Sequence, residues 1–283
     1  MNKPTLALLA ASVLTASSSQ SLVITSTTTD GNALTTAILG SGITAGTSTY
    51  VGDTNQSGFF TDGIASGIGI ENGIILSTGN AYDAPGPNNL DDMSVSTNSG
   101  GDAALDALVS GTTNDTASLT FDFVSTGGDL FFNFVFASEE YNEFVNSEFN
   151  DVFAFFVDGV NIATAPDGQA VSINTVNCGN PFSGAGPNCS SYNNNDISDG
   201  GPFFDLAYDG FTDVFTASIL GLSAGSHTMK FAIADTGDSS LDSAVFIEGG
   251  TFSDTSTSVP EPGSLALLGL GLVGLRLSRK KTA

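Results

Sequence analysis

The sequence predicts an all-β protein built as a two-sheet antiparallel sandwich of the jelly-roll type, with one or two short helices. The chain of 283 residues contains 34 glycines, 21 phenylalanines and no tryptophan, a composition that suits short strands joined by many turns. Apolar runs of strand length recur at short spacing along most of the chain. A closed β-barrel fits the same pattern and is the alternative architecture.

Short elements are expected in the first part of the chain. Residues 33–40 (ALTTAILG) predict a short helix that Asn32 caps and a glycine ends. Strands punctuated by glycine are then expected at residues 42–52, 58–70 and 72–79. A second short helix is expected at residues 103–109.

The middle of the chain contains the clearest strand patterns. Within residues 115–125, Leu119, Phe121 and Phe123 alternate with Thr120 and Asp122, the signature of a half-buried strand. Residues 130–137 and 151–157 are apolar nearly throughout, as expected for strands covered on both faces. An Asp-Gly turn leads into residues 160–164, which are therefore expected to pair antiparallel with 151–157.

Residues 168–208 are rich in asparagine, glycine and serine and predict one long loop, with 172–176 as its candidate strand. A loop of this length is usually functional or stapled. Cys178 and Cys189, the only cysteines, flank a Gly/Pro stretch in it and predict a disulfide in an oxidising compartment. Zinc is disfavoured because no histidine or further cysteine lies nearby in the sequence. Strands are expected to resume at residues 213–220, 227–234 and 243–252.

Both ends of the chain have the build of sorting signals. Residues 1–21 combine one lysine, an apolar run and small residues, which predicts a secretory signal peptide. Residues 255–283 predict a linker followed by a tail with a Pro-Glu-Pro motif, an apolar run and a basic end. The apolar run, 265–275, spans about 16 Å as a helix, roughly half of a hydrocarbon core. It predicts a transmembrane helix that inserts transiently in the inner membrane, and the domain between the two signals is residues 22–254.

The tail resembles the PEP-CTERM sorting signal of exopolysaccharide-producing Gram-negative bacteria. The residues that carry the motif are Val259, Pro260, Glu261 and Pro262. The resemblance implies cleavage near this motif by an exosortase, a membrane enzyme, with the secretion machinery as a further partner during export. It implies a destination at the cell surface, in the outer membrane or outside the cell, where a biofilm forms.

The body of the chain resembles the choice-of-anchor L domain. The matching segments occur in the family's order, and they are GIGIENGIILSTGNA (67–81), FVFASEEYNEFVNSEFNDVFAFFVDG (134–159), SINTVN (172–177), YDGFT (208–212) and AIADTGDSSLDSAVFIEGGTF (232–252). The family consists of bacterial surface or secreted domains beside varied anchoring signals and brings no defined molecular activity. The resemblance implies an exported cell-surface or extracellular-matrix protein with a structural or adhesive role, associated with exopolysaccharide.

The charge of the body argues against nucleic acid as a partner. Between residues 23 and 258 the only lysine or arginine is Lys230, whereas all 30 acidic residues except Glu261 lie there. Such a body repels phosphate backbones and anionic lipid, so membrane contact is expected only through the tail. This negative charge either attracts divalent cations or only keeps an exported protein soluble.

Acidic residues cluster at three predicted strand ends. We expect some of them to hold a structural Ca²⁺, because Ca²⁺ selects six to eight oxygen ligands with flexible geometry. The candidate ligands are Glu139, Glu140, Asp151, Asp235, Asp238 and Asp242. Adjacent strand residues point to opposite faces, so Glu139 and Glu140 share one ion only if Ser138 begins a bulge or turn. The alternative is that these acids form turns and caps.

A carbohydrate-active enzyme is the alternative function, with Glu139 or Glu140 and Asp151 as the acid and base of a glycosidase. Such clefts usually offer aromatic platforms, but tryptophan is absent and most phenylalanines are expected in the core. The only histidine, His227, is expected to be a solvent-facing strand residue rather than part of a Ser-His-Asp site. The sequence therefore predicts no enzyme and no catalytic residue.

Overall fold

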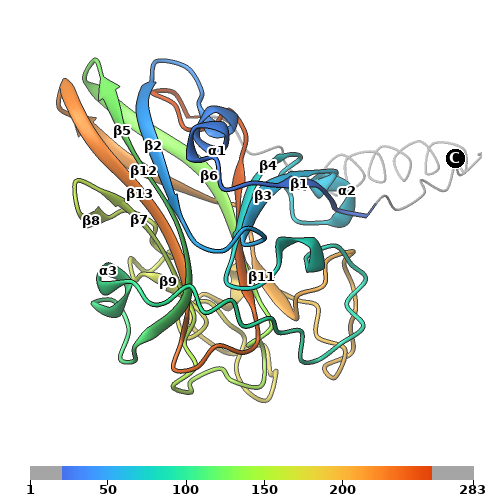
Figure 1. Ribbon diagram of the computed structural model, residues 1–283. Helices are drawn as coiled ribbons and strands as arrows, with labels where there is room; N and C mark the ends of the chain where they lie inside the picture. The colour runs from blue at the N-terminus through green and yellow to red at the C-terminus, as the bar shows by residue number, and fades with distance from the viewer. Residues whose placement is uncertain (1–20, 257–283) are drawn as a thin grey trace, which may run out of the picture.

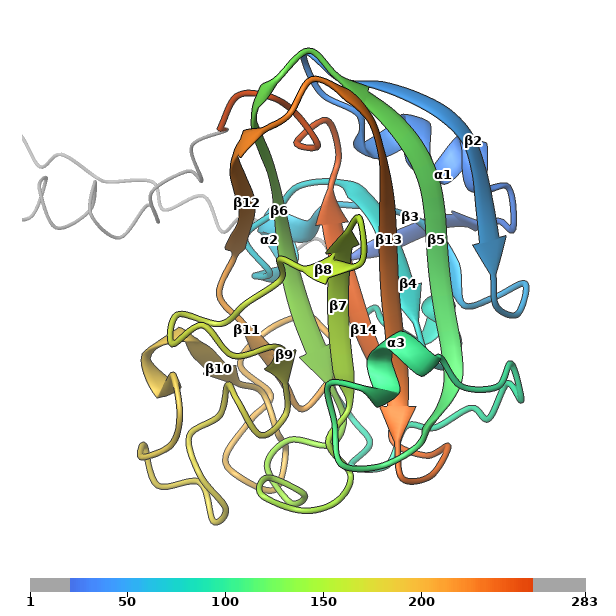
Figure 2. The same cartoon turned by 90° about the vertical axis from the view of Figure 1, so that its left-hand side faces the viewer.

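Two antiparallel β-sheets pack face to face in the computed structural model, which describes residues 21–256 (Figures 1 and 2). The two-sheet sandwich predicted from the sequence is confirmed, and the closed barrel is wrong, because each sheet has two free edges. No helix within residues 21–256 is long and apolar enough to cross a membrane. The predicted signal peptide (residues 1–21) lies outside the described residues except for Ser21, and so do the sorting motif and the apolar tail run.

The larger sheet has eight strands, and β6 is its most extensively paired member. In spatial order these strands are β1 (Val23–Thr27), β3 (Ser57–Thr61), β4 (Gly73–Ser77), β14 (Ser243–Glu248), β6 (Gly128–Ser138), β11 (Gly210–Thr212) and β10 (Tyr192–Asn194), with β12 (Phe215–Leu222) also paired to β6. One edge of β6 pairs with β14. Its other edge pairs first with β12 and then with β11, so β6 is covered along most of its length.

The smaller sheet has six strands, with β13 between β5 and β7 (Figure 2). Its strands are β2 (Thr44–Val51), β5 (Thr113–Ser125), β13 (Gly225–Thr236), β7 (Val152–Val157), β8 (Val160–Asn161) and β9 (Val171–Ser172). The helices are short, and they are α1 (Gly31–Ile38), α2 (Gly63–Ser66), α3 (Ala103–Asp106) and the 3₁₀ turns η1 (Ala81–Asp83) and η2 (Cys189–Ser191). As predicted, β7 and β8 pair antiparallel around the Asp-Gly turn.

Phenylalanine side chains fill the space between the two sheets. Phe132 of the larger sheet meets Phe155 of the smaller sheet edge to face, with ring centroids 4.1 Å apart, and Phe231 packs on Phe155 at 4.5 Å. Such T-shaped pairs are the favoured aromatic geometry. Most of β6 and all of β7 are buried on both faces, because loops cover the outer face of β6 and α3 covers that of β7. This double cover explains their nearly continuous apolar sequences.

The local predictions are partly corrected by the structure. The first helix is present, but Asp30 caps it, since its carboxylate accepts the backbone N–H groups of Asn32 and Ala33. The predicted strand 58–70 is wrong in its second half, because the chain enters α2 after β3. Gly67 ends α2 with φ of 104°, a left-handed conformation in which glycine avoids steric strain.

The long loop contains more structure than the sequence predicts. The candidate strand 172–176 is a strand only at Ser172, the end of β9, after which Thr175 turns the chain by bonding through its hydroxyl to the Ala170 carbonyl. Further along, β10 and β11 add two short strands to the larger sheet. The predicted disulfide between Cys178 and Cys189 is present and closes the intervening segment.

Candidate cation-binding site

Four strand ends meet at one end of the sandwich, shown at the bottom of Figure 2. Here β6 and β13 end while β7 and β14 begin. Ser138 of β6 pairs with Ser243 of β14, and Val152 of β7 pairs with Ala234 of β13. The structure therefore brings the six predicted ligands to one edge, which we call the acidic edge; it comprises Glu139, Glu140, Asp151, Asp235, Asp238 and Asp242.

The carboxylates of the acidic edge are unusually well buried. All of them except Asp238 are 1% exposed to solvent. Asp238 is partly exposed and accepts the backbone N–H of Ser240. Removing a carboxylate from water is costly unless a partner or a proton neutralises it, so the acidic edge needs a source of compensation.

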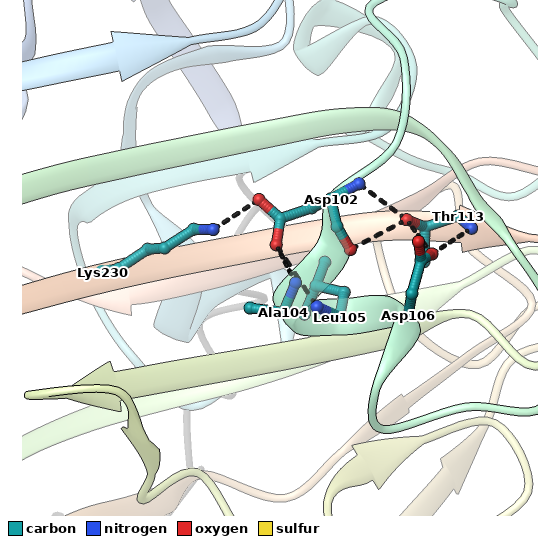
Figure 3. A network of polar contacts seen from close by, with 6 residues as sticks. All are labelled: Asp102, Ala104, Leu105, Asp106, Thr113 and Lys230. Atoms are coloured by element: carbon teal, nitrogen blue, oxygen red, sulfur yellow. Dashed lines mark hydrogen bonds and ion pairs between the residues drawn. The ribbon is translucent and has the colours of Figure 1, made fainter.

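That compensation does not come from a basic side chain. Lys230 is the only lysine or arginine in the described chain, and its ammonium group contacts Asp102 on the outer face of the smaller sheet (Figure 3). Asp102 also caps α3 through the N–H groups of Ala104 and Leu105. His227 pairs with Asp158 at 2.7 Å, so neither side chain pairs with the acidic edge.

The strand register divides the acidic edge into two groups. Ser138 pairs with Gly210 as well as with Ser243, so the next residues along these three strands lie in a row. We call them the outer row: Glu139 and Asp242 belong to the acidic edge, and Asp209, which was not a predicted ligand, joins them. Ala137, two residues before Glu139, and Ala244, two residues after Asp242, face the loops that cover the outside of the larger sheet. The outer row therefore faces these loops, because strand side chains alternate with a period of two.

The remaining acidic residues gather around Asp151, which lies two residues before Phe153 of the core between the sheets. We call them the inner group, and they are Glu140, Asp151, Asp235 and Asp238. Asp151 is the best anchored, since it accepts the Thr236 N–H at 2.9 Å and the Ser243 hydroxyl at 2.7 Å. Within the described part of the chain, neither oxygen of Asp235 receives a hydrogen bond of normal geometry, although Asp151 and Thr78 lie beside it.

Glu139 and Glu140 belong to different groups although they are adjacent in sequence. Burial raises the pKa of each to about 10, and neighbouring charges add to this: chiefly Asp209 for Glu139 and Asp151 for Glu140. The N–H of Met93 lies near Glu139 and lowers its pKa, but no donor within residues 21–256 reaches either carboxylate oxygen of Glu139 with hydrogen-bond geometry. One ion shared by all six residues thus conflicts with the alternation of strand side chains.

Burial also raises the pKa of other acids in both groups. It raises the pKa of Asp151 and Asp242 to about 7 and that of Asp235 well above its usual value. Both oxygens of Asp242 accept the Val95 N–H, each at 3.1 Å, which opposes the rise. A bound cation or protons can neutralise these groups, and they offer a cation only oxygen ligands, the set that Ca²⁺ prefers.

Two family models match the chain. The model for the choice-of-anchor L domain covers residues 14–253, and the model for the PEP-CTERM protein-sorting motif covers residues 258–281. The chain belongs to the choice-of-anchor L domain family. No curated protein and no solved structure matches it. The sorting motif makes this choice-of-anchor L protein an exported protein directed to the cell surface and processed by an exosortase.

Sequence reasoning missed one group of acids in this choice-of-anchor L domain. Asp91, Asp196 and Asp209 have carboxylate oxygens that all lie within 4.8 Å of one another. It is the one group of three acidic, histidine or cysteine side chains within residues 21–256 that meets this limit. A signal was available, because PNNLDD (87–92) and NNNDISDG (193–200) are acidic, amide-rich loops, but nothing in the sequence shows that two loops so far apart meet.

Proposed function

We propose that this choice-of-anchor L domain is a Ca²⁺-stabilised structural or adhesive component of the cell surface or extracellular matrix, associated with exopolysaccharide. The observation that carries the calcium part is the inner group, where Glu140, Asp151 and Asp235 are each 1% exposed without a basic partner. Ionised carboxylates in such a place cost several kcal/mol each unless a cation compensates them. Extracellular Ca²⁺-binding modules have dissociation constants of about 0.1 to 1 mM, which suits a protein outside the cell.

The charge of the body supports an association with acidic polysaccharide that depends on Ca²⁺. Residues 21–256 have only Lys230 as a permanently basic side chain, and Asp102 neutralises it. Direct contact with an acidic polysaccharide is therefore repulsive, whereas divalent cations can bridge exposed carboxylates on both partners. This makes Ca²⁺ the link between the fold and the proposed adhesive role.

The glycosidase alternative is disfavoured by the burial of its proposed acids. Glu139, Glu140 and Asp151 are each 1% exposed, so a polysaccharide chain has no access to them in this structure. The matched family is one of non-enzymatic surface proteins. The glycosidase function would be favoured instead if the protein released reducing sugar from the host's own polysaccharide and Glu139→Gln or Glu140→Gln abolished this activity.

Thermal unfolding with and without Ca²⁺ tests the calcium part of the proposal. A Ca²⁺ concentration of about 100 times the dissociation constant adds about 2.7 kcal/mol to the stability of a protein that binds one ion only when folded. For a domain of this size we expect the midpoint to rise by about 5 to 10 °C relative to protein in chelator. Glu140→Gln removes a carboxylate of the inner group and should reduce the rise, whereas the exposed, matched Glu71→Gln should not. An unchanged wild-type midpoint in saturating Ca²⁺ refutes a stabilising ion.

Cosedimentation with the host's exopolysaccharide tests the adhesive part separately. We expect the protein to pellet with the polysaccharide in Ca²⁺ and to stay in the supernatant in chelator, because cation bridges form only in the first case. Equal recovery in the supernatant under both conditions would leave the protein without its proposed partner. That result would not contradict the proposal that Ca²⁺ stabilises the domain, because thermal unfolding tests that proposal separately.

A further inference from the structure

Two loops far apart in the sequence lie against each other over the outer face of the larger sheet. Residues 84–102 connect η1 to α3, and residues 195–209 connect β10 to β11. Backbone hydrogen bonds join them, with the Ala207 N–H donating to the Ala84 carbonyl at 3.0 Å. Their apolar side chains Met93 and Leu206 belong to the same buried cluster on the sheet.

We propose that a Ca²⁺ ion bound by Asp91, Asp196 and Asp209 clamps these two loops together, at a site separate from the inner group. Asp91 belongs to the first loop, and Asp196 and Asp209 are near the two ends of the second. Their oxygens lie within 4.8 Å of one another. Two ligands on opposite sides of a Ca²⁺ ion, each at about 2.4 Å, are about 4.8 Å apart, so three oxygens within this limit suit one ion.

A second observation, independent of the clustering, also points to a ligand. Asp209 is fully buried, at 0% exposure, and its Oδ1 accepts the Asn88 side-chain amide at 2.6 Å. Among the residues that the structure describes, 21–256, its Oδ2 has no hydrogen-bond partner. Native proteins rarely leave a buried carboxylate oxygen without a partner, and a cation among the three carboxylates would satisfy it.

The other two proposed ligands, Asp196 and Asp91, differ in their exposure to solvent. Asp196 is also fully buried and is fixed in place, since its Oδ1 accepts the N–H and the hydroxyl of Ser198 at 2.6 and 2.8 Å. Asp91 is exposed, so solvent and ions have access to the cluster from its side. Two fixed ligands and one accessible ligand allow the ion to enter and leave without unfolding the domain.

The nearest polar neighbours supply no positive charge. The side-chain amide of Asn142 donates to Asp196 at 3.3 Å and to Asp199 at 3.1 Å, and its carbonyl accepts the Tyr192 hydroxyl. An amide donor is neutral, so it orients these carboxylates but does not compensate them. The ligand set contains oxygen alone, which favours Ca²⁺ over zinc or copper.

Counting bound Ca²⁺ by equilibrium dialysis of the full chain tests this site. Asp196→Asn and Asp209→Asn keep the size of the side chain and remove one charged ligand each. We expect each variant to bind one ion fewer than the wild type in the millimolar range. Asp92→Asn, an exposed neighbour of Asp91 that loses the same charge, should bind as many ions as the wild type.

The remaining outcomes decide between this site and the inner group. If the Asp196 and Asp209 variants bind as many ions as the wild type, the site proposed here is wrong. If only Glu140→Gln loses one ion, Ca²⁺ binds to the inner group and not between the loops. If only the loop variants lose one ion, Ca²⁺ binds between the loops and not to the inner group.

Asp91→Asn tests the site even if the variants of the buried residues misfold, because the Asp91 side chain is exposed. It should weaken Ca²⁺ binding at least about tenfold with an unchanged circular dichroism spectrum, and an unchanged affinity contradicts the proposal.

Discussion

Gly79 illustrates how a single residue makes room for the acidic edge. It follows β4 and lies opposite Asp242 of the outer row. A Cβ atom at Gly79 would lie 1.7 Å from Asp242 Oδ2 and 2.1 Å from its Cγ. Asp242 is 1% exposed and has little space to move away. The absence of a side chain at residue 79 is thus a steric requirement of the buried carboxylate.

We expect Gly79→Ala to destabilise the domain by about 1 to 3 kcal/mol, the usual cost of overpacking a buried position. The added methyl group displaces Asp242 and breaks its two contacts with the Val95 N–H. Urea unfolding measures the change. Gly46→Ala is the matched control, because a Cβ atom there would meet its nearest neighbour at an ordinary 3.4 Å. Equal losses in the two variants would mean that the contact with Asp242 does not matter.

His227 is placed differently from the prediction. It is 7% exposed rather than solvent-facing, because Nδ1 lies 2.7 Å from Asp158 Oδ2 and the ring packs on Phe123. The hydrogen bond with Asp158 raises the pKa of His227 above 6.5 and lowers that of Asp158 below 3.8. The pair therefore stabilises the fold most when both partners are ionised.

The pair predicts a small pH dependence with a definite sign. The contribution of His227 is fully present below pH 6.5, its unfolded value, and is lost as the pH rises through the higher pKa of the folded state. Asp158 is 52% exposed, so we expect Asp158→Asn to cost less than about 1 kcal/mol at pH 5.5 and less still at pH 8.5. Urea unfolding at both pH values measures this, with Asp122→Asn as a nearby charge control. A cost that grows with pH would contradict the assignment.

At the scale of elements, apolar pattern predicts strands well and their partners poorly. The runs 130–137 and 151–157 are strands as expected, and alternation in β5 correctly separates buried Phe121 and Phe123 from exposed Asp122. Short strands such as β10 and β11, three residues each, leave no periodic signal in a polar loop. Their existence depends on the pairing of β11 with β6 and of β10 with β11, which is a tertiary effect.

Prediction of the candidate site met the same limit, because the sequence does not show which strands are neighbours. It did predict that six carboxylates lie at one edge, since that inference needs only the composition and the strand boundaries. The division between Glu139 and Glu140 followed from alternation, but their partners depend on which strands flank β6. Asp91 and Asp196 were missed because their proximity depends on two loops that pack together only in the folded domain.

The disulfide between Cys178 and Cys189 belongs to the long loop, and we expect its removal to destabilise that region. Closing a loop of this length restricts the unfolded chain, which corresponds to about 2 to 3 kcal/mol of stability. Cys178→Ser with Cys189→Ser should lower the urea midpoint accordingly. Wild-type protein under reducing conditions should unfold at the same midpoint as the double variant, and a difference between them would point to an effect of the substitutions themselves.

At the scale of the whole molecule, the distribution of charge matters more than its total. Within residues 21–256, the two side chains that can balance an acid are Lys230 and His227, and both belong to β13 and pair away from the acidic edge. Buried acids accumulate at one end of the sandwich, where Glu139, Glu140 and Asp209 have their pKa raised mainly by burial. The stability of the domain should therefore respond to pH and Ca²⁺ together.

We expect the stability of Ca²⁺-free protein to fall as the pH rises from about 4.5 to 10. Burial raises the pKa of Glu140 from 4.5 to about 10 and that of Asp151 from 3.8 to about 7, so the folded state holds protons that the unfolded state has released. A raised carboxyl pKa contributes stability below its unfolded value and loses it as the pH passes through the folded value. Ca²⁺ replaces these protons and binds more tightly at higher pH. Thermal unfolding at pH 5, 7 and 9, in chelator and in Ca²⁺, should show a gap between the two midpoints that widens with pH. A constant gap would mean that Ca²⁺ does not replace protons on these buried carboxylates.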